Sequence, residues 1–420
     1  MAAPTHTDPR PLIAAVAKVL HGNGQETEET LGTVRRLGRH YGLETTLDIN
    51  WGELIVRHGP DQRTPASVVE VAPVSIGMNR VIAATGLVEN VLANRLPIEE
   101  AEPRLGEAAS APPASDLLFS CASAVAALAL AVSFGITHPW AALLIFIGGG
   151  LGGYVRRRLG RHGADAFVQA FCAALLAGVI GALGVRLGLS SELRLIALCP
   201  CMVIVPGPHI LNGMLDLLGG RIPLGIARLV FATIVLTAIC AGVLLGMALC
   251  GADVPPSPAG RSPHVWLIMT SGAAAAVCYG VFYAMPPRLL VWPALMAVVI
   301  DMGRWAAMTL LDQGPVVGAA VAGLIAGLLA LPLSRWRHVP FASIGFSSIV
   351  SLIPGALVFR MAGGLWALQT ASPPRIAPLV DASAVDGSTA VLIVLALSIG
   401  IVAPKYLYDA LGRGAREAQG

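Results

Sequence analysis

The sequence predicts a mainly helical membrane protein that carries a small soluble α+β domain at its N-terminal end. Three observations lead to this fold class. Hydrophobic residues make up 55% of the 420 residues and charged residues only 13%. Residues 1–116 contain 10 Lys and Arg against 15 Asp and Glu, whereas the rest of the chain contains 18 and 10. Apolar segments of about 20 residues, the length that crosses a bilayer as a helix, recur from residue 117 onward.

The composition also excludes several classes of protein. A net charge of +3 is small for this length and argues against a nucleic-acid-binding domain. All seven cysteines lie in the hydrophobic part without the paired spacing of a zinc site, so we expect them to pack as small apolar residues. Cys199 and Cys201 form a C-x-C pair but have no neighbouring histidine or acid. We therefore expect neither a metal nor a cofactor.

Residues 1–102 read as a cytoplasmic head, because no apolar run at the N-terminus resembles a signal peptide. Helical spacing over 11–42, broken at 22–24, predicts two helices. Alternation then predicts strands at 45–49, 53–57 and 67–71, and helices follow at 78–93 and from Ile98. Residues 103–116 are proline- and alanine-rich and predict a linker. Six polar side chains of the head match no catalytic template and are interpreted as solvated surface: His21, His40, His58, Glu26, Glu28 and Glu29.

The hydrophobic part predicts ten membrane spans, the fourth and ninth of them interrupted. A first group of five covers 117–250 and a second covers 265–409, followed by a cytoplasmic tail at 410–420. The expected spans are 117–136, 139–154, 166–187, 193–219, 224–250, 265–284, 287–303, 315–333, 341–367 and 389–409.

The two groups of spans are related by a constant offset of 148 residues. It separates Pro206 from Pro354, each in a Pro-Gly pair, and also Leu117 from Val265 and Pro139 from Pro287. Only the tenth span is displaced, by an apparent insertion at 371–388. Because each group has an odd number of spans, the second enters the membrane from the opposite side. The sequence thus predicts an inverted 5+5 repeat, an arrangement typical of secondary transporters.

The arginines and lysines of the short loops predict which side of the membrane the head occupies. With the head inside, eleven of these residues fall in the cytoplasm and five fall on the opposite side. The strongest group follows the second span, at Arg156, Arg157, Arg158 and Arg161. We therefore expect a multi-pass protein with both termini in the cytoplasm.

A Pro-Gly pair in the middle of a span weakens the helix and is tolerated only where protein or a water-filled cavity lines it. Pro206-Gly207 and Pro354-Gly355 both fall near mid-membrane and are predicted to form the substrate site. After Pro208 a new half-helix would begin, and its free amide groups would attract a carboxylate.

Polar residues inside the spans are the other candidates for function. Asn212 and Asp216 lie four apart on one helical face, and Asp216 would exchange protons or pair with Arg221 or Arg228. Asp301 is a second proton-coupling candidate, and Arg304 would form an ion pair with it or bind substrate. Arg360 would bind a carboxylate or extend toward water, and His209 and Gln169 are weaker candidates.

The chain resembles the threonine/serine exporter family of bacterial and fungal membrane proteins. The resemblance extends over essentially the whole chain, in the order of head and spans and in three groups of residues. These are Val205-Pro206-Gly207 with Asn212, Gly213, Asp216, Gly220, Gly225 and Arg228; Ile353-Pro354-Gly355; and Gly24-Gln25-Glu26 with Leu96-Pro97-Ile98-Glu99-Glu100-Ala101. The resemblance implies export of threonine and serine across the bacterial inner membrane, driven by the proton-motive force.

Four hypotheses follow. The leading one is a secondary exporter of small hydroxy amino acids that works by proton antiport, with a possible homo-oligomeric state. The second is a dicarboxylate exporter resembling split two-chain relatives linked to succinate, which Arg304 and Arg360 in the cavity would favour. A membrane-anchored hydrolase and a non-transporting receptor are less favoured, because ten spans exceed what an anchor needs. No phosphate-binding loop is present, which argues against ATP-driven transport.

Overall fold

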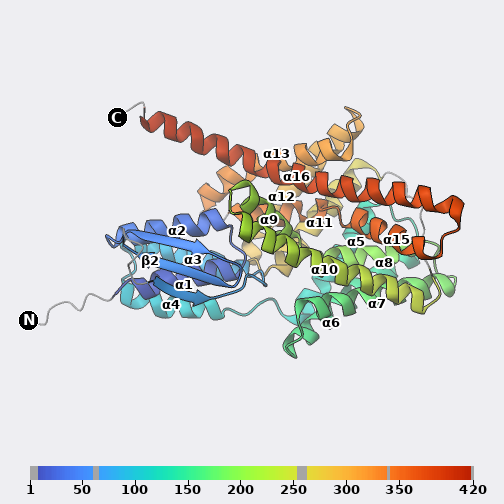
Figure 1. The fold of residues 1–420 in the computed structure, drawn as a ribbon, viewed down its shortest axis with the longest axis horizontal. Coiled ribbons are helices and arrows are strands. Elements are labelled where there is room, and N and C mark those ends of the chain that lie inside the picture. Colours follow the sequence, from blue (N-terminus) through green and yellow to red (C-terminus); the bar gives the residue numbers. More distant parts are fainter. Residues whose placement is uncertain (1–7, 60–65, 253–262, 338–340, 418–420) are drawn as a thin grey trace, which may run out of the picture.

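The computed structural model describes residues 8–59, 66–252, 263–337 and 341–417. The chain forms a head at one end of the molecule and a body of packed helices, which we call the membrane body (Figure 1). We call the end of the membrane body that contacts the head its head side. The opposite end is the far side.

The head consists of four helices and one antiparallel sheet, as predicted. Its elements are α1 (Arg10–Gly22), α2 (Thr27–His40), β1 (Thr45–Ile49), β2 (Glu53–His58), β3 (Ala66–Glu70), α3 (Met78–Leu92) and α4 (Ile98–Ser110). The strand order is β1-β2-β3, with Thr45 opposite His58 and Glu53 opposite Glu70. The apolar faces of the helices and the inward side chains of β1 and β2 form a core of their own. The predicted linker is helical as far as Ser110, so only a short extended segment joins the head to the membrane body.

The interpretation of the polar head residues as solvated surface is wrong for three of the six. His21, His58 and Glu26 are buried, whereas His40 and Glu28 are exposed. For His21 and Glu26 the reason is tertiary, because the end of α1 and the start of α2 face the membrane body and not water. His58 ends β2 and is buried inside the head, where its ring hydrogen-bonds to Thr45. Sequence patterns within the head do not show which of its surfaces contact the membrane body.

The membrane body begins with α5 (Asp116–Ser133), α6 (Pro139–Arg161), α7 (Ala166–Arg186), α8 (Leu193–Val203), α9 (Gly207–Leu218) and α10 (Ile222–Leu249). It continues with α11 (Val265–Phe282), η1 (Pro287–Leu289), α12 (Val291–Thr309), α13 (Pro315–Arg337), α14 (Phe341–Ile349), η2 (Val350–Leu352), α15 (Gly355–Ala367), η3 (Leu368–Thr370) and α16 (Pro373–Glu417). Within the described ranges, eight helices are long and apolar enough to cross a membrane, or nine when α8 and α9, bent by 59°, are taken as one span.

The difference from the predicted ten spans lies in α6. This helix is 23 residues long, but its glycines and C-terminal arginines lower its hydropathy. The apparent insertion at 371–388 also has a simple form, because it is the first part of α16. That helix continues without interruption for 45 residues toward the head end of the molecule (Figure 1).

Glycines bring two pairs of helices into close contact. A Cβ atom at Gly178, Gly242 or Gly246 would collide with the backbone of the facing helix in the α7 and α10 pair. A Cβ atom at Gly323 or Gly400 would likewise collide with the backbone of the facing helix in the α13 and α16 pair. Small residues let helix backbones approach within van der Waals contact, which drives helix association in lipid. The α7 and α10 pair and the α13 and α16 pair are therefore packed backbone against backbone.

Candidate functional site

The two interruptions predicted from the Pro-Gly pairs have the same local geometry. Pro206 adopts φ −77° and ψ 56°, and Pro354 adopts φ −78° and ψ 50°. In each case the glycine amide donates to the carbonyl two residues earlier, Gly207 to Val205 at 2.8 Å and Gly355 to Ile353 at 2.7 Å. These values describe an inverse γ-turn, which ends one helix and starts the next in a new direction.

The tertiary structure places the two interruptions against each other. A Cβ atom at Gly207 would lie 2.5 Å from Cδ1 of Ile353 and 2.8 Å from Cγ2 of Val350. In the reciprocal contact, a Cβ atom at Gly355 would lie 3.2 Å from Cγ2 of Val205. The two Pro-Gly interruptions, which are 148 residues apart in sequence, therefore meet inside the membrane body, and only glycine fits the closest approach.

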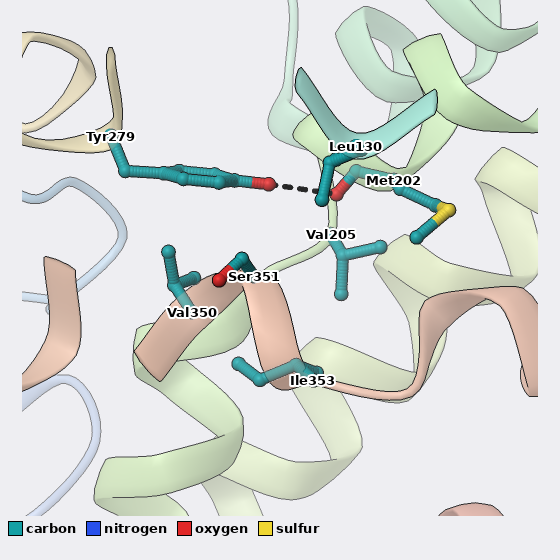
Figure 2. Close-up of a pocket in the computed structure, with 7 residues that line it drawn as sticks. All are labelled: Leu130, Met202, Val205, Tyr279, Val350, Ser351 and Ile353. Carbon is teal, nitrogen blue, oxygen red and sulfur yellow. Dashed lines mark hydrogen bonds between the residues drawn. The ribbon is translucent and has the colours of Figure 1, made fainter. Parts of the chain in front are cut away.

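A small cavity lies where the interruptions meet (Figure 2). Its volume is about 10 Å³, which is room for about one water molecule. The hydroxyl of Tyr279, from α11, donates to the carbonyl of Met202 at 3.3 Å and closes one side. The lining residues are Leu130, Met202, Val205, Tyr279, Val350, Ser351 and Ile353. Both halves of the membrane body thus contribute to this cavity.

A second and much larger cavity, which we call the head-side cavity, lies between the head, α6, α7 and the first interruption. Its volume is about 900 Å³. It opens to solvent, because exposed residues such as Pro113 and Asp165 line it. Pro206 and Val205 form part of its wall, and Val205 also lines the small cavity. A path thus leads from solvent on the head side to the first interruption, where Val205 borders both cavities.

Positive side chains line the head-side cavity, and the sequence-based prediction did not place them there. Arg156, Arg157 and Arg161 all lie on α6 and border the cavity. The sequence placed them only as loop charges that orient the protein. The sequence analysis underestimated the length of α6. Because Pro139–Arg161 is helical throughout, the arginines extend from a helix and not from a loop.

His209 lies between the cavity and a loop of the head. Its ring is buried and lies 4.9 Å from the ring of Phe231 and 6.5 Å from that of Trp51. Trp51 occupies the turn between β1 and β2 and also contacts Phe231, with ring centroids 5.1 Å apart. An aromatic residue between Asn50 and Gly52 in a polar hairpin is the sequence signal for this docking contact. The predicted site residue His209 thus borders the head-side cavity.

Asn212, Asp216 and Arg228 form a separate cluster below the head. The Asp216 carboxylate lies 3.0 Å from Nε of Arg228 and 3.1 Å from Nε of Arg221. Asp216 and Arg228 are almost completely buried, and Arg221 extends the cluster to Glu28 of the head at 2.9 Å. The Asn212 amide donates to the carbonyl of Gly24 at 3.3 Å. Asn212 and Asp216 share one face of α9, Arg228 reaches Asp216 from α10, and this face of α9 contacts the head.

The head is also tied to the second half of the membrane body. Lys405 of α16 lies 3.0 Å from a carboxylate oxygen of Glu26 and 2.9 Å from one of Glu29. The amide of Met78 donates to the carbonyl of Tyr283 at 2.9 Å. Burial raises the pKa of Glu26, and the positive charge of Lys405 opposes that shift. The head therefore bridges both halves of the body at the start of α2.

The remaining predicted residues lie apart from the two interruptions. Asp301 is buried against Gly272 of α11, and the described part of the chain offers it no ion pair, not even with Arg304. Arg360 pairs with Asp386 of α16 at 2.9 Å and borders neither cavity. Gln169 lines the head-side cavity and donates to the carbonyl of Ala164 at 2.8 Å. Within the described ranges, no group of three or more His, Cys, Asp or Glu side chains is placed to hold a metal ion.

We predict that His21 makes the stability of the folded protein sensitive to pH. Burial and the positive charge of Arg228 lower the pKa of His21 from 6.5 to about 3. Below pH 6.5 the unfolded chain binds a proton that the folded protein does not, so stability falls with acidification, by about 2 kcal/mol at pH 5. Thermal unfolding between pH 7 and pH 5 should therefore show a smaller loss for His21→Phe than for the wild type. The Glu26 carboxyl acts in the opposite direction in both proteins and cancels in the comparison.

The control for this prediction is His40→Phe, because His40 is exposed on the same head. This variant should keep the pH dependence of the wild type. An equal pH dependence in the wild type and His21→Phe would contradict the prediction.

Long apolar helices, two of them interrupted at a small cavity beside the larger head-side cavity, define the class: a multi-pass membrane protein built as a transporter. The chain belongs to the threonine/serine exporter family. Residues 11–250 match the family described as "Putative threonine/serine exporter", and residues 269–407 match "Threonine/Serine exporter, ThrE". The family is one of membrane exporters and not of enzymes, so a small-molecule substrate is implied.

Three relatives are similar to this chain. A "Probable threonine/serine exporter" of Mycobacterium tuberculosis is 24% identical over 96% of this chain and 77% of its own length. The "Threonine/serine exporter" of Corynebacterium glutamicum is 23% identical over 83% of this chain and 74% of its own. The "Probable succinate transporter subunit YjjP" of Klebsiella aerogenes is 29% identical over 26% of this chain and 43% of its own. No solved structure matches the chain.

Proposed function

We propose that this protein exports threonine and serine from the cytoplasm across the bacterial inner membrane. The observation that carries the proposal is the meeting of two interrupted helices at the end of a path from the head-side cavity. The names of the two long relatives support the substrate class. The arginines of α6 lie on the head side, so the positive-inside rule supports a cytoplasmic head.

We further propose that the membrane body is an inverted 5+5 repeat, with α6 as the span that its low hydropathy obscures. The same helix pairs are in contact in both halves, for example α7 with α10 and α13 with α16. Hydrogen bonds follow the same offset of 148 residues. Ser123 donates to the carbonyl of Phe119 at 2.9 Å, and Ser271 donates to that of Leu267 at 2.6 Å. Two halves of this kind would rock about the interruptions to expose the site on each side in turn.

In this proposal the substrate binds between Pro206-Gly207 and Pro354-Gly355. The start of α9 presents the positive end of a helix dipole to the carboxylate. The expected free amide groups are absent from its first turn, because Pro208 has no N–H and the amides of Gly207, His209 and Ile210 donate to Val205 and Pro206 carbonyls. With its volume of about 10 Å³, the small cavity is closed to an amino acid in this conformation. The head-side cavity has ample room, so the structure has the features of a state that receives substrate from the head side. Widening at Val205 would then admit the substrate.

Proton coupling is proposed to use Asp301. Its carboxyl is buried and has no ion pair in the described part of the chain, so its charge can change without breaking one. Asp216 is the other candidate, but its carboxylate pairs with both Arg221 and Arg228. Proton exchange at Asp216 would weaken both of these ion pairs, so the contacts suit a structural role better than proton exchange.

Proteoliposomes with an imposed pH gradient test this proposal. Threonine and serine flux should follow the gradient in the wild type and should lose that dependence in Asp301→Asn. Asp312→Asn is the matched control, because Asp312 is exposed and its φ of 50° suits asparagine. Gradient-independent flux in the wild type would reject proton coupling, and absence of threonine and serine flux would reject the substrate.

The alternative is export of a dicarboxylate such as succinate, supported by the partial similarity to the succinate transporter subunit. Arg360 supports it less than the sequence suggested, because it pairs with Asp386 away from both cavities. The same proteoliposomes would decide between the substrates, since succinate flux without threonine flux would favour the alternative.

A further inference from the structure

The arginines of the head-side cavity differ in what they contact. Arg157 donates to the carbonyl of Ala114 at 3.0 Å, and Arg161 pairs with Asp116 at 2.8 Å. Arg80, from the head, donates to the carbonyl of Ala111 at 3.0 Å. These three arginines thus hold the segment that joins the head to the membrane body.

Arg156 has no such partner. Its Nε and Nη1 atoms are buried, and no described residue offers either of them a hydrogen bond. The guanidinium lies over the ring of Phe282, 5.1 Å from its centroid. An aromatic ring covers one face of the guanidinium but leaves the N–H groups at its edge unsatisfied. A half-buried guanidinium with unpaired N–H groups at the wall of a large cavity is suited to bind an anion.

We propose that Arg156 binds the carboxylate of the transported molecule in the head-side cavity. The planar guanidinium presents paired N–H donors that match the two oxygens of a carboxylate, which a lysine would not do. The cavity of about 900 Å³ accommodates a small amino acid with its hydration water. Pro206 lines the same cavity, so a ligand held by Arg156 is already on the path to the interruption.

The internal offset supports this assignment. Residue 304 is the counterpart of residue 156 at the offset of 148, and it is also an arginine. In the proposed inverted repeat, Arg304 has the same place in the second half as Arg156 has in the first. When the two halves exchange conformations, Arg304 would therefore lie relative to the far side as Arg156 now lies relative to the head side. The assignment rests on the proposed function only in that the cavity receives a carboxylate to be transported.

Site-specific chemical modification of the full-length protein tests the assignment. Phenylglyoxal reacts with guanidinium groups, and mass spectrometry reports the rate at each arginine. Threonine or serine should slow the modification of Arg156 at least about tenfold at saturation. The amino alcohol of threonine, in which a hydroxymethyl group replaces the carboxylate, should not. Arg158 is the internal control, because it lies on the same helix, hydrogen-bonds to Tyr154 and does not line the cavity.

Binding affinities of variants provide the second measurement and decide the matter if Arg156 resists the reagent. Arg156→Gln should weaken threonine binding roughly 10- to 100-fold, the range for hydrogen bonds to a charged group. It should leave the affinity for the amino alcohol unchanged. Arg158→Gln should change neither affinity.

The outcomes separate this inference from the proposed function. Protection of Arg156 by succinate but not by threonine would support the carboxylate site and reject the threonine/serine substrate. Threonine export without protection by any carboxylate, or equal loss of threonine and amino alcohol binding in Arg156→Gln, would overturn the assignment. A protein that neither exports nor binds any of these carboxylates would overturn both.

Discussion

Gly207→Val should reduce threonine export roughly 5- to 100-fold. The valine side chain would enter the space occupied by Ile353 and Val350, and Val350 is β-branched and has little freedom to move. Overpacking of this kind costs about 1–3 kcal/mol. Because about 1.4 kcal/mol changes an equilibrium tenfold, the strain is sufficient to disfavour conformations in which the interruptions approach. Export by cells that produce equal amounts of each protein is the measurement.

The matched control is Gly314→Val. A Cβ atom at Gly314 meets no heavy atom within 4 Å, so the same substitution adds no collision there. Its export should equal that of the wild type. Wild-type export by Gly207→Val would show that contact between the interruptions has no part in transport.

Asp216→Asn should destabilise the protein by about 3–5 kcal/mol, because it leaves the buried Arg228 guanidinium without a counter-charge. Thermal unfolding of the purified protein should show a clear decrease in Tm. The double variant Asp216→Leu with Arg228→Met should recover most of the loss, since apolar residues of similar volume tolerate burial at this position. Recovery of stability in the double variant distinguishes an uncompensated charge from simple loss of packing.

Glu28→Gln is the control for this pair of variants. Glu28 and Asp216 both bind Arg221, but the side chain of Glu28 is 53% exposed and that of Asp216 only 2%. Exposed ion pairs contribute about 1 kcal/mol or less, so Glu28→Gln should unfold close to the wild type. Equal Tm values for Asp216→Asn and Glu28→Gln would contradict a structural role for the buried pair.

Local patterns in the chain predicted the elements of the fold well. The break between α1 and α2 follows Gly22-Asn23-Gly24, and the three strands follow the alternation of apolar residues. The interruptions at Pro206 and Pro354 follow directly from the loss of a backbone donor at proline. The glycine-rich α6 was underestimated in length, because its arginines resemble a loop in a hydropathy count.

The predicted site separated into three groups because partners distant in sequence decide the role of a polar residue. Asp216 and Asn212 satisfy the helical spacing expected for one face, yet that face meets Gly24 and the basic pair Arg221 and Arg228. Arg360 pairs with the carboxylate of Asp386 on α16, which is 26 residues further along the chain. Helical periodicity reports which residues share a face but contains no information on what that face contacts.

The sequence by itself determined that this is a membrane protein with a soluble head, and that its two halves share an offset of 148 residues and a Pro-Gly interruption. Hydropathy and backbone chemistry are local properties, so they can be assessed along a single chain. Only the tertiary structure decided that the two interruptions touch, that a cavity leads to one of them from the head side, and that no described residue there hydrogen-bonds to Nε or Nη1 of Arg156. These are properties of packing between distant segments, and packing decides which buried charges are compensated and which remain free to bind a ligand.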